Sequence, residues 1–476
     1  MSFKKAAAAC RIVSHSPWLW FGSLQALLIA YYQWTQQLQP SLTLAHDTGL
    51  FLAAAQFPWM SAGMLNHYVL PGYPTVIQIA RALSPDYRYL PWLHLGVQAL
   101  AAGLWYRGLR RLEYPSLSAF AVSAPLLALP LMFSDFSPAA VASDATGLAL
   151  ALATIGWFLG LFHPSTRRRG WMILSFLFFA SVLVRPVYLF LLGLLPFLSL
   201  ALTRSHLPRA TYRLRRWVFA RTTALVMLVP LILFSGYRKM VIGDFSVSSG
   251  LGFNLIGITG QLLTPEMIPE LPSDLRRFAA SVIKHREERD WVGHPYRSPL
   301  TGPHGLYGSQ LRENFNLLSW YAGFKAAAEE YPENIAGMNR LLTRFSFHVI
   351  RLRPRLYATW VVLCWMHGLR MLLSAPWVLG EISAGLILYL SLIVLRTFGS
   401  PRQEADAGSA VRLRLAGLSG LIALFFFATK FSEVALVEAM LMRYVLAAAA
   451  LVPSVLVAYL LVVAPQQWDR KLNFRR

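Results

Sequence analysis

The sequence predicts an all-α polytopic membrane protein, with about ten transmembrane helices, outer-face interfacial helices and a small, mostly helical outer cap. Hydrophobic residues make up 56% of the 476 residues and charged residues 14%, whereas about a quarter of a soluble protein is charged. The apolar residues also form long runs, as needed to cross a bilayer core of about 30 Å. Basic residues gather between these runs, which is typical of the cytoplasmic loops of membrane proteins.

Ten apolar runs are expected to span the membrane. They lie at 17–35, 89–107, 117–133, 144–162, 171–184, 187–203, 217–236, 376–396, 413–429 and 443–463. Two further apolar stretches contain interruptions, Pro71 and Pro74 in 68–83, and His367 and Arg370 in 356–375. We expect both of these stretches to be helices that lie in the outer interface or dip into it.

The distribution of charge sets the expected orientation. The chain has 44 Lys and Arg against 22 Asp and Glu, a net charge of +22. With ten spans and both termini in the cytoplasm, the basic clusters fall inside. These clusters are Lys4, Lys5 and Arg11; Arg107, Arg110 and Arg111; Arg167, Arg168 and Arg169; Arg204 to Arg221; Arg396 to Arg414; and Arg470 to Arg476. Because the basic residues occupy scattered loops without a basic-aromatic patch, nucleic acid is not an expected partner.

The chain divides into three expected regions. Residues 1–236 form an N-terminal transmembrane module that begins with an uncleaved signal anchor. Residues 237–355 form the extracytoplasmic cap, which Pro and Gly interrupt in "TPEMIPELPSD". Residues 356–476 contribute an interfacial helix and the last transmembrane helices. The two cysteines, Cys10 and Cys364, indicate no disulfide framework.

Asp47 is the first acidic residue and follows the first apolar run, in "HDTGLFLAAAQF". The Asp-Thr-Gly of aspartic proteases needs a β-rich domain and a second Asp that shares a proton, and neither is indicated here. Helix capping is a simple alternative, since an Asp before a helix accepts backbone N–H bonds. Capping does not account for the other charges predicted on the same side.

Several polar residues are expected at the same outer face. The segment "NHYVLPGYP" contains His67, and "FSDFSPAAVASDATG" contains Asp135 and Asp144. A third outer turn holds Arg185 in "LVRPVYLF", and a fourth, "SEVALVEAMLMRYV", holds Glu433, Glu438, Arg443 and Tyr444. A charge at a helix end costs little by itself. The recurrence of carboxylates and arginines on one face nevertheless favours a shared site.

Four sequence features support a family resemblance. They are an Asp followed by an aromatic and small residues, "HDTGLFLAAA"; a proline-rich start to an interfacial helix, "LPGYPTVIQIARAL"; an Asp opening a span, "SDATGLALALATIGW"; and a late Arg-Tyr, "MRYVLAAAALVP". With these features the chain resembles the GT-C superfamily of polytopic glycosyltransferases, in particular its protein O-mannosyltransferase and aminoarabinose transferase branch. Such enzymes take a sugar from a polyprenyl-phosphate carrier.

The resemblance implies a set of roles. Asp47 would be the base of an inverting transfer, and Asp144 would orient the sugar or help to hold a metal ion. Arg443 and Arg185 would bind the phosphate, with Tyr444, His67 and Asp135 as further substrate-binding candidates. No cofactor is certain. A divalent cation is a candidate, with Asp47, Asp144 and His46 as its ligands.

The expected function is therefore transfer of a sugar from a polyprenyl-phosphate donor to an extracytoplasmic glycan, lipid or protein. The chain would be a multi-pass protein of the bacterial inner membrane, surrounded by lipid, with its active site on the extracytoplasmic face. A transporter or flippase, or a non-catalytic membrane component of polysaccharide assembly, stays an alternative. A transporter is expected to bury charge near the middle of the membrane and often to show inverted repeats; a scaffold needs no convergence of charges.

Overall fold

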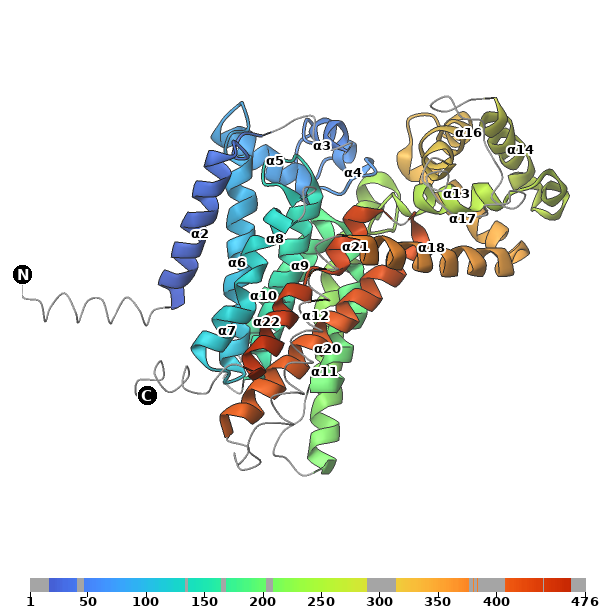
Figure 1. Ribbon diagram of the computed structural model, residues 1–476. Helices are drawn as coiled ribbons and strands as arrows, with labels where there is room; N and C mark the ends of the chain where they lie inside the picture. Colours follow the sequence, from blue (N-terminus) through green and yellow to red (C-terminus); the bar gives the residue numbers. More distant parts are fainter. Residues whose placement is uncertain are drawn as a thin grey trace, which may run out of the picture.

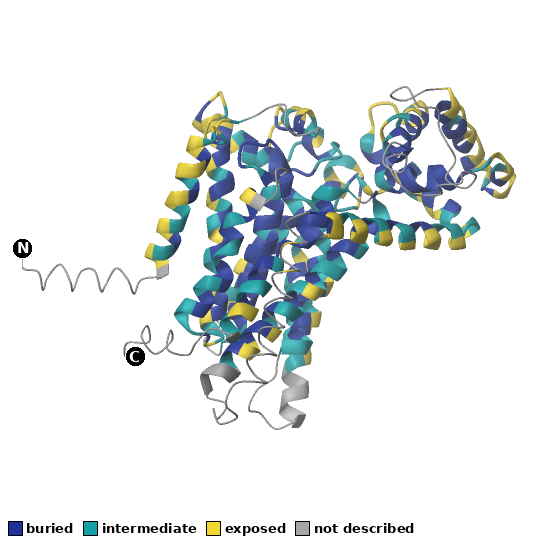
Figure 2. Cartoon of the chain, in the orientation of Figure 1, coloured by how far each residue is buried: buried dark blue, intermediate teal, exposed yellow. Residues whose placement is uncertain are grey.

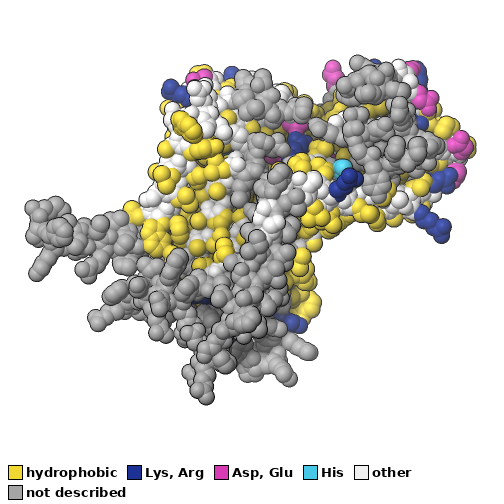
Figure 3. Space-filling view, in the orientation of Figure 1, with side chains coloured by type: hydrophobic (Ala, Val, Ile, Leu, Met, Phe, Trp, Pro, Cys, Tyr) yellow, Lys and Arg dark blue, Asp and Glu magenta, His cyan; other side chains and the backbone are white. Residues whose placement is uncertain are grey.

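The computed structural model describes residues 17–40, 47–132, 136–163, 168–202, 209–288, 314–375, 380, 383, 407–439 and 441–463. Every regular element within these ranges is a helix. The fold is thus that of an α-helical membrane protein, with apolar side chains spread over the sides of its main bundle (Figure 3). His46, Asp135 and most of the expected run 376–396 lie outside the described residues.

Most of the chain forms a bundle of helices that run in roughly one direction (Figure 1). Its members are α2 (Pro17–Trp34), α6 (Leu90–Arg111), α7 (Ser116–Ser123), α8 (Pro125–Met132), α9 (Ser143–Leu159), α10 (Arg168–Val184), α11 (Leu191–Leu202), α12 (Arg209–Ile242), α20 (Ala407–Val437) and α22 (Val452–Val463). Helix α9 lies at the centre and is buried along most of its length. The backbones of α9 and α6 are in close contact at Gly156, where a Cβ would lie 2.5 Å from the Trp105 backbone nitrogen.

The expectation of about ten spans is wrong in number. Among the described residues, five helices are long and apolar enough to cross a membrane: Ser143–Phe162, Arg216–Ile242, Pro354–Ser374, Val411–Val437 and Met442–Val462. Ser116–Leu131 and Pro186–Leu202 are shorter apolar helices. The other expected runs within the described ranges do form helices. However, α2 contains Gln25 and Gln33, α6 ends in Arg110 and Arg111, and α10 begins with two arginines.

Basic helix ends lie together at the end of the bundle opposite the cap. Helix α6 ends at Arg111, α10 begins at Arg168 and α12 begins at Arg209, and all three ends lie in the lower half of Figure 1. This arrangement agrees with the predicted segregation of basic residues to one side of the membrane.

Short helices cover the other end of the bundle. They are α3 (Thr48–Ala54), α4 (Ala62–Leu65) and α5 (Gly72–Leu83), which lie near its top in Figure 1. Helix α18 (Pro354–Ser374) meets the length and composition of a span, yet it runs across the direction of α12 and α20 (Figure 1). An interfacial position, as predicted for 356–375, fits this direction.

The segment after α12 forms a helical cap with its own core. Its helices are α13 (Leu251–Leu262), η4 (Pro265–Glu270), α14 (Ser273–Glu287), the π-helix η5 (Leu318–Ala322), α16 (Gly323–Glu330) and α17 (Ile335–Leu352). Phe253, Phe278, Leu318 and Phe345 are among its buried apolar residues, and Figure 2 shows this buried interior.

A buried arginine fastens the cap to the bundle. Arg238 of α12 is fully buried and donates to the Leu65 carbonyl of α4 at 2.8 Å and to Asp244 Oδ2 at 3.0 Å. Removing one partner from such a buried pair strongly destabilises a protein. Helix α12 continues to Ile242, beyond residue 236 where the sequence placed the boundary; the three-region division itself stays a prediction.

Candidate functional site

The first pair of the site joins residues that are far apart in the chain. Asp47 immediately precedes α3, and Arg443 lies in the first turn of α21 (Met442–Ala448). Arg443 Nη1 donates to Asp47 Oδ2 at 3.0 Å. The side chains are partly exposed, Arg443 by 24% and Asp47 by 35%. A guanidinium on a carboxylate is a charge-assisted contact, stronger than a neutral hydrogen bond.

Capping does not explain Asp47. The residue stands at the N-cap position of α3, but its side chain makes no capping hydrogen bond and its backbone is helical, at φ −87° and ψ −1°. N-cap residues typically have extended backbone angles and a side chain that accepts from the first turn. The Asp47 carboxylate is turned to Arg443 instead.

The second pair is more deeply buried. Asp144, in the first turn of α9, pairs through Oδ2 with Nη1 of Arg185. Arg185 stands in extended backbone between α10 and η3 (Pro186–Phe190) and also donates to Ser143 Oγ at 3.3 Å. Burial lowers the pKa of Arg185, but Asp144 together with Tyr444 and Tyr188 raises it by more, so the net pKa is raised. Arg185 is thus a permanent cation beside Asp144.

Two local features bring the two pairs close together, so that Asp144 also interacts electrostatically with Arg443. The buried Thr48 Oγ1 donates to the Val141 carbonyl at 3.1 Å. This hydrogen bond connects the start of α3 to the segment that leads into α9. Gly147 lies one turn after Asp144. A Cβ there would meet the Tyr188 ring at 2.8 Å and Arg185 Cβ at 3.1 Å, so only glycine lets Arg185 approach this closely.

Tyr444 connects the charged groups. Arg443 Nη2 donates to its hydroxyl at 3.0 Å, and the hydroxyl donates to Glu438 Oε1. Burial raises the pKa of Glu438, while Arg443 and this hydroxyl oppose the shift. Three cations lie near the Tyr444 ring: the Arg443 guanidinium carbon at 5.0 Å from its centroid, that of Arg185 at 5.5 Å and Lys430 Nζ at 5.7 Å. Such distances permit cation–π attraction.

Sequence reasoning missed Lys430. The expected span ended at residue 429, and Glu433 was placed in an outer turn, but α20 continues to Val437. Lys430 is therefore inside the packed helix, 1% exposed, with its Nζ 3.7 Å from Glu433 Oε2. The one available signal was the i, i+3 spacing of Lys430 and Glu433, which places them on one helix face.

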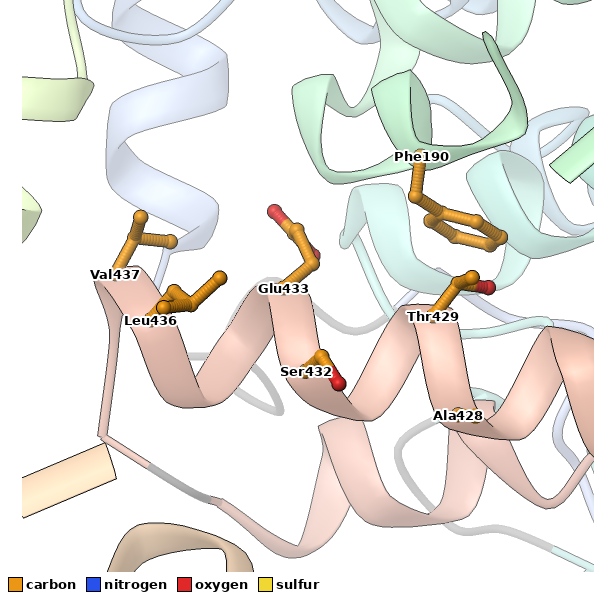
Figure 4. Close-up of a pocket in the computed structure, with 7 residues that line it drawn as sticks. All are labelled: Phe190, Ala428, Thr429, Ser432, Glu433, Leu436 and Val437. Carbon is orange, nitrogen blue, oxygen red and sulfur yellow. The ribbon is translucent and has the colours of Figure 1, made fainter. Parts of the chain in front are cut away.

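An apolar groove of about 400 Å³ lies beside these charges. It is lined by Phe190 of η3 and, from α20, by Ala428, Thr429, Ser432, Glu433, Leu436 and Val437. Figure 4 shows Phe190 pointing toward α20 from the opposite wall, with Glu433 projecting into the space between them. One carboxylate thus links an apolar surface to the buried cations.

The structure does not bring every predicted residue into this network. His67 lies between α4 and α5, where its Nδ1 accepts from the Val69 backbone at 3.3 Å and its ring stacks on Tyr68. Burial lowers the pKa of His67. Neighbouring Tyr68 does interact electrostatically with Asp47, so this loop borders the site. Tyr68 also lies 5.2 Å, centroid to centroid, from Trp320 of the cap.

The predicted metal site has no matching cluster of ligand residues in the part of the chain that the structure describes. No group of three or more His, Cys, Asp or Glu there is arranged to hold an ion. Asp47 and Asp144 each face a different arginine, and His46 lies outside the described residues. We therefore assign no step to a metal ion.

No protein-family model matches the chain, and none of the curated proteins or solved structures matches it either. Carboxylates can accept protons, and arginine or lysine can stabilise an anionic leaving group. Both kinds of group meet here: Asp144 interacts electrostatically with Arg185, Arg443 and Lys430. Acidic and basic side chains are visible together between the bundle and the cap (Figure 3).

Proposed function

We propose that the protein is a membrane glycosyltransferase that moves a sugar from a polyprenyl-phosphate carrier to an extracytoplasmic glycan, lipid or protein. One observation carries the proposal. Two aspartates and three cations meet at one end of the bundle beside an apolar groove; they come from α9, α20, α21 and the chain just before α3 and η3. A lipid phosphate needs both cations and an apolar surface. The resemblance of the sequence to GT-C glycosyltransferases points to the same chemistry.

In the proposed reaction, Asp47 takes the proton from an acceptor hydroxyl. The acceptor oxygen bonds to the anomeric carbon while the bond from that carbon to the phosphate oxygen breaks. The electron pair leaves with the polyprenyl phosphate, and the anomeric configuration inverts. Arg443 and Arg185 stabilise the charge on the departing phosphate, since a guanidinium can hold phosphate oxygens bidentately.

The ion pair between Asp47 and Arg443 determines the sequence of steps in this reaction. While Arg443 donates to Asp47 Oδ2 at 3.0 Å, that carboxylate oxygen is already engaged in a charge-assisted hydrogen bond. A donor phosphate that binds Arg443 competes with Asp47 and releases it. The base would then become available only when the donor is in place.

The direct test is sugar transfer by the purified protein. The protein, reconstituted in vesicles, is supplied with polyprenyl-phosphate-linked sugars and candidate acceptors, and products are identified by mass spectrometry. We expect a glycosylated acceptor and free polyprenyl phosphate in equal amounts. A sugar that is missing from the acceptor glycans of a deletion strain would identify the sugar that is transferred.

A transporter would give a different result. Labelled donor would move from one leaflet to the other with its sugar still attached, and no acceptor would be glycosylated. The Asp47→Asn variant separates the two outcomes further, because transport has no need of a base that removes a hydroxyl proton. Flipping without transfer would therefore contradict the proposed function.

A further inference from the structure

Lys430 is a buried cation that has no role in the proposed reaction. It is 1% exposed and lies between two tyrosine rings, with Nζ 5.4 Å from the Tyr188 centroid and 5.7 Å from that of Tyr444. Cation–π attraction of this kind offsets part of the cost of burying an ammonium group. It provides no hydrogen-bond acceptor for the three N–H groups of the side chain.

The ion pair of Lys430 is loose. Its Nζ lies 3.7 Å from Glu433 Oε2, beyond the distance of a hydrogen bond. Within the described part of the chain, neither Lys430 Nζ nor Glu433 Oε2 has a hydrogen-bond partner. Buried polar groups are nearly always hydrogen-bonded, and a buried charge without such bonds costs free energy. Burial of this ammonium group therefore costs folding free energy. A cost of this kind indicates that the group has a role in function.

The other two cations differ from Lys430. Arg443 donates directly to Asp47 at 3.0 Å, and Arg185 pairs directly with Asp144. Of the three cations around the Tyr444 ring, Lys430 thus has the weakest hold on a carboxylate. An incoming anion has to displace only Glu433 to reach it.

Glu433 also connects Lys430 to the apolar groove. Its side chain lines the groove together with Phe190, Leu436 and Val437 and projects into it (Figure 4). A ligand with an apolar tail along these residues would bring its head group to Glu433. A negatively charged head group would then replace Glu433 beside Lys430.

We propose that Lys430 binds the phosphate of a phosphate-headed lipid whose tail lies in the groove lined by Phe190, Leu436 and Val437. Glu433 occupies the position of this phosphate until the lipid binds. The identity of the lipid as polyprenyl phosphate rests on the proposed function. The site itself rests on the burial of Lys430, its loose pair and the adjoining groove.

The test measures lipid binding to the purified, detergent-solubilised protein by native mass spectrometry. The probes are sugar-free polyprenyl phosphate, polyprenol, phosphatidic acid and inorganic phosphate. We expect Lys430→Met to weaken binding of polyprenyl phosphate roughly ten-fold or more, as for the loss of a charge-assisted contact. Lys430→Arg should retain most of the affinity, and binding of polyprenol should not change. Lys325→Met, at an exposed lysine of the cap, is the matched control.

Glu433→Gln provides a second reading that does not depend on removing the lysine. It removes the resting counter-charge, so polyprenyl phosphate should bind more tightly than to the wild type. The proposal is overturned if Lys430→Met binds polyprenyl phosphate like the wild type, if Glu433→Gln weakens binding, or if the wild type binds none of the lipid probes. Should Lys430→Met fail to fold, the Glu433→Gln measurement decides.

The probes also separate this proposal from the proposed function. Binding of phosphatidic acid but not polyprenyl phosphate, with loss in Lys430→Met, would support the lipid-phosphate site and contradict the choice of donor. Binding of polyprenyl phosphate with no sugar transfer in any assay would leave the site standing without the enzyme. Equal binding of inorganic phosphate and the lipids would show that the groove has no part and would overturn the proposal.

Discussion

The two aspartates of the site differ in their surroundings. The side chains of Asp144 and Arg185 are 7% and 14% exposed, whereas those of Asp47 and Arg443 are 35% and 24% exposed. A buried ion pair is costly to break by removing one partner, while a partly exposed pair can exchange its partners with a ligand. Asp144 with Arg185 is therefore suited to hold the site in a fixed arrangement, and Asp47 with Arg443 is suited to the exchange of partners that the proposed transfer requires.

The first residue-scale prediction concerns Asp47→Asn. The amide cannot accept a proton, so transfer should fall by at least about 100-fold, the usual contribution of a general base. The variant should also bind sugar-free polyprenyl phosphate more tightly, because Asn does not compete with the phosphate for the charge of Arg443. Turnover and lipid binding in purified protein check both effects. Asp86→Asn serves as a control at an exposed carboxylate, and weaker lipid binding in Asp47→Asn would mean that Asp47 positions Arg443 instead of masking it.

A second prediction concerns Arg443. Arg443→Ala should raise the KM for the lipid donor or lower kcat, with a loss of about 1.5–3 kcal/mol in kcat/KM. Arg443→Lys should restore only part of it, because one ammonium group cannot reproduce the fork that contacts Asp47 and Tyr444 together. Steady-state kinetics with varied donor concentration measure the effect. Wild-type kinetics in a folded Arg443→Ala protein would remove Arg443 from the phosphate site.

At the scale of elements, the site depends on how closely α9 approaches η3. Gly147 allows this approach, since a Cβ would lie 2.8 Å from the Tyr188 ring and 3.1 Å from Arg185 Cβ. The hydrogen bond from Thr48 to Val141 fixes the start of α3 to the segment that precedes Asp144. Asp47 and Asp144, from separate segments of the chain, are thereby both held near Arg443.

The element-scale prediction is that Gly147→Ala displaces Arg185. Overpacking of a tight helix contact costs about 1–3 kcal/mol, so thermal stability in detergent should decrease and transfer should fall more than stability alone explains. Gly193→Ala in α11 is the matched control, because a Cβ there meets nothing within 4 Å. Equal activity and stability in the two variants would show that the contact between α9 and η3 does not position Arg185.

At the scale of the molecule, the cap, the short helices α3 to α5 and the charged site share one end of the bundle (Figure 1). The basic ends of α6, α10 and α12 share the other. Basic residues remain preferentially in the cytoplasm, so the charged site is expected to face outward.

The whole-molecule prediction is an accessibility pattern. In a variant without Cys10 and Cys364, single cysteines at Arg168 and Ala407 should be protected from a membrane-impermeant maleimide in intact cells. A cysteine at Glu330 of the cap should be labelled. Labelling at Arg168 from outside would invert the topology and place the site in the cytoplasm.

The sequence by itself determined the class of protein and the candidate residues at the helix ends. Long apolar runs produce helices whatever they pack against, because backbone groups in a bilayer must bond within their own segment. Asp47, Asp144, Arg185, Arg443 and Tyr444 stood out as polar residues where such runs end, and this signal is local. The number of spans was overestimated, because an apolar run marks a helix more reliably than it marks a complete crossing.

Only the tertiary structure decided which charges pair and which are buried. Asp47 and Arg443 are separated by almost the whole chain, and no local pattern in the sequence indicates that they meet. Lys430 looked like the end of a span, because a hydropathy profile treats a charge as a boundary. In the folded protein α20 continues past it, and Glu433 and the rings of Tyr188 and Tyr444 offset part of the cost of its burial. The two tyrosine rings come from other segments of the chain, and only folding brings them to Lys430.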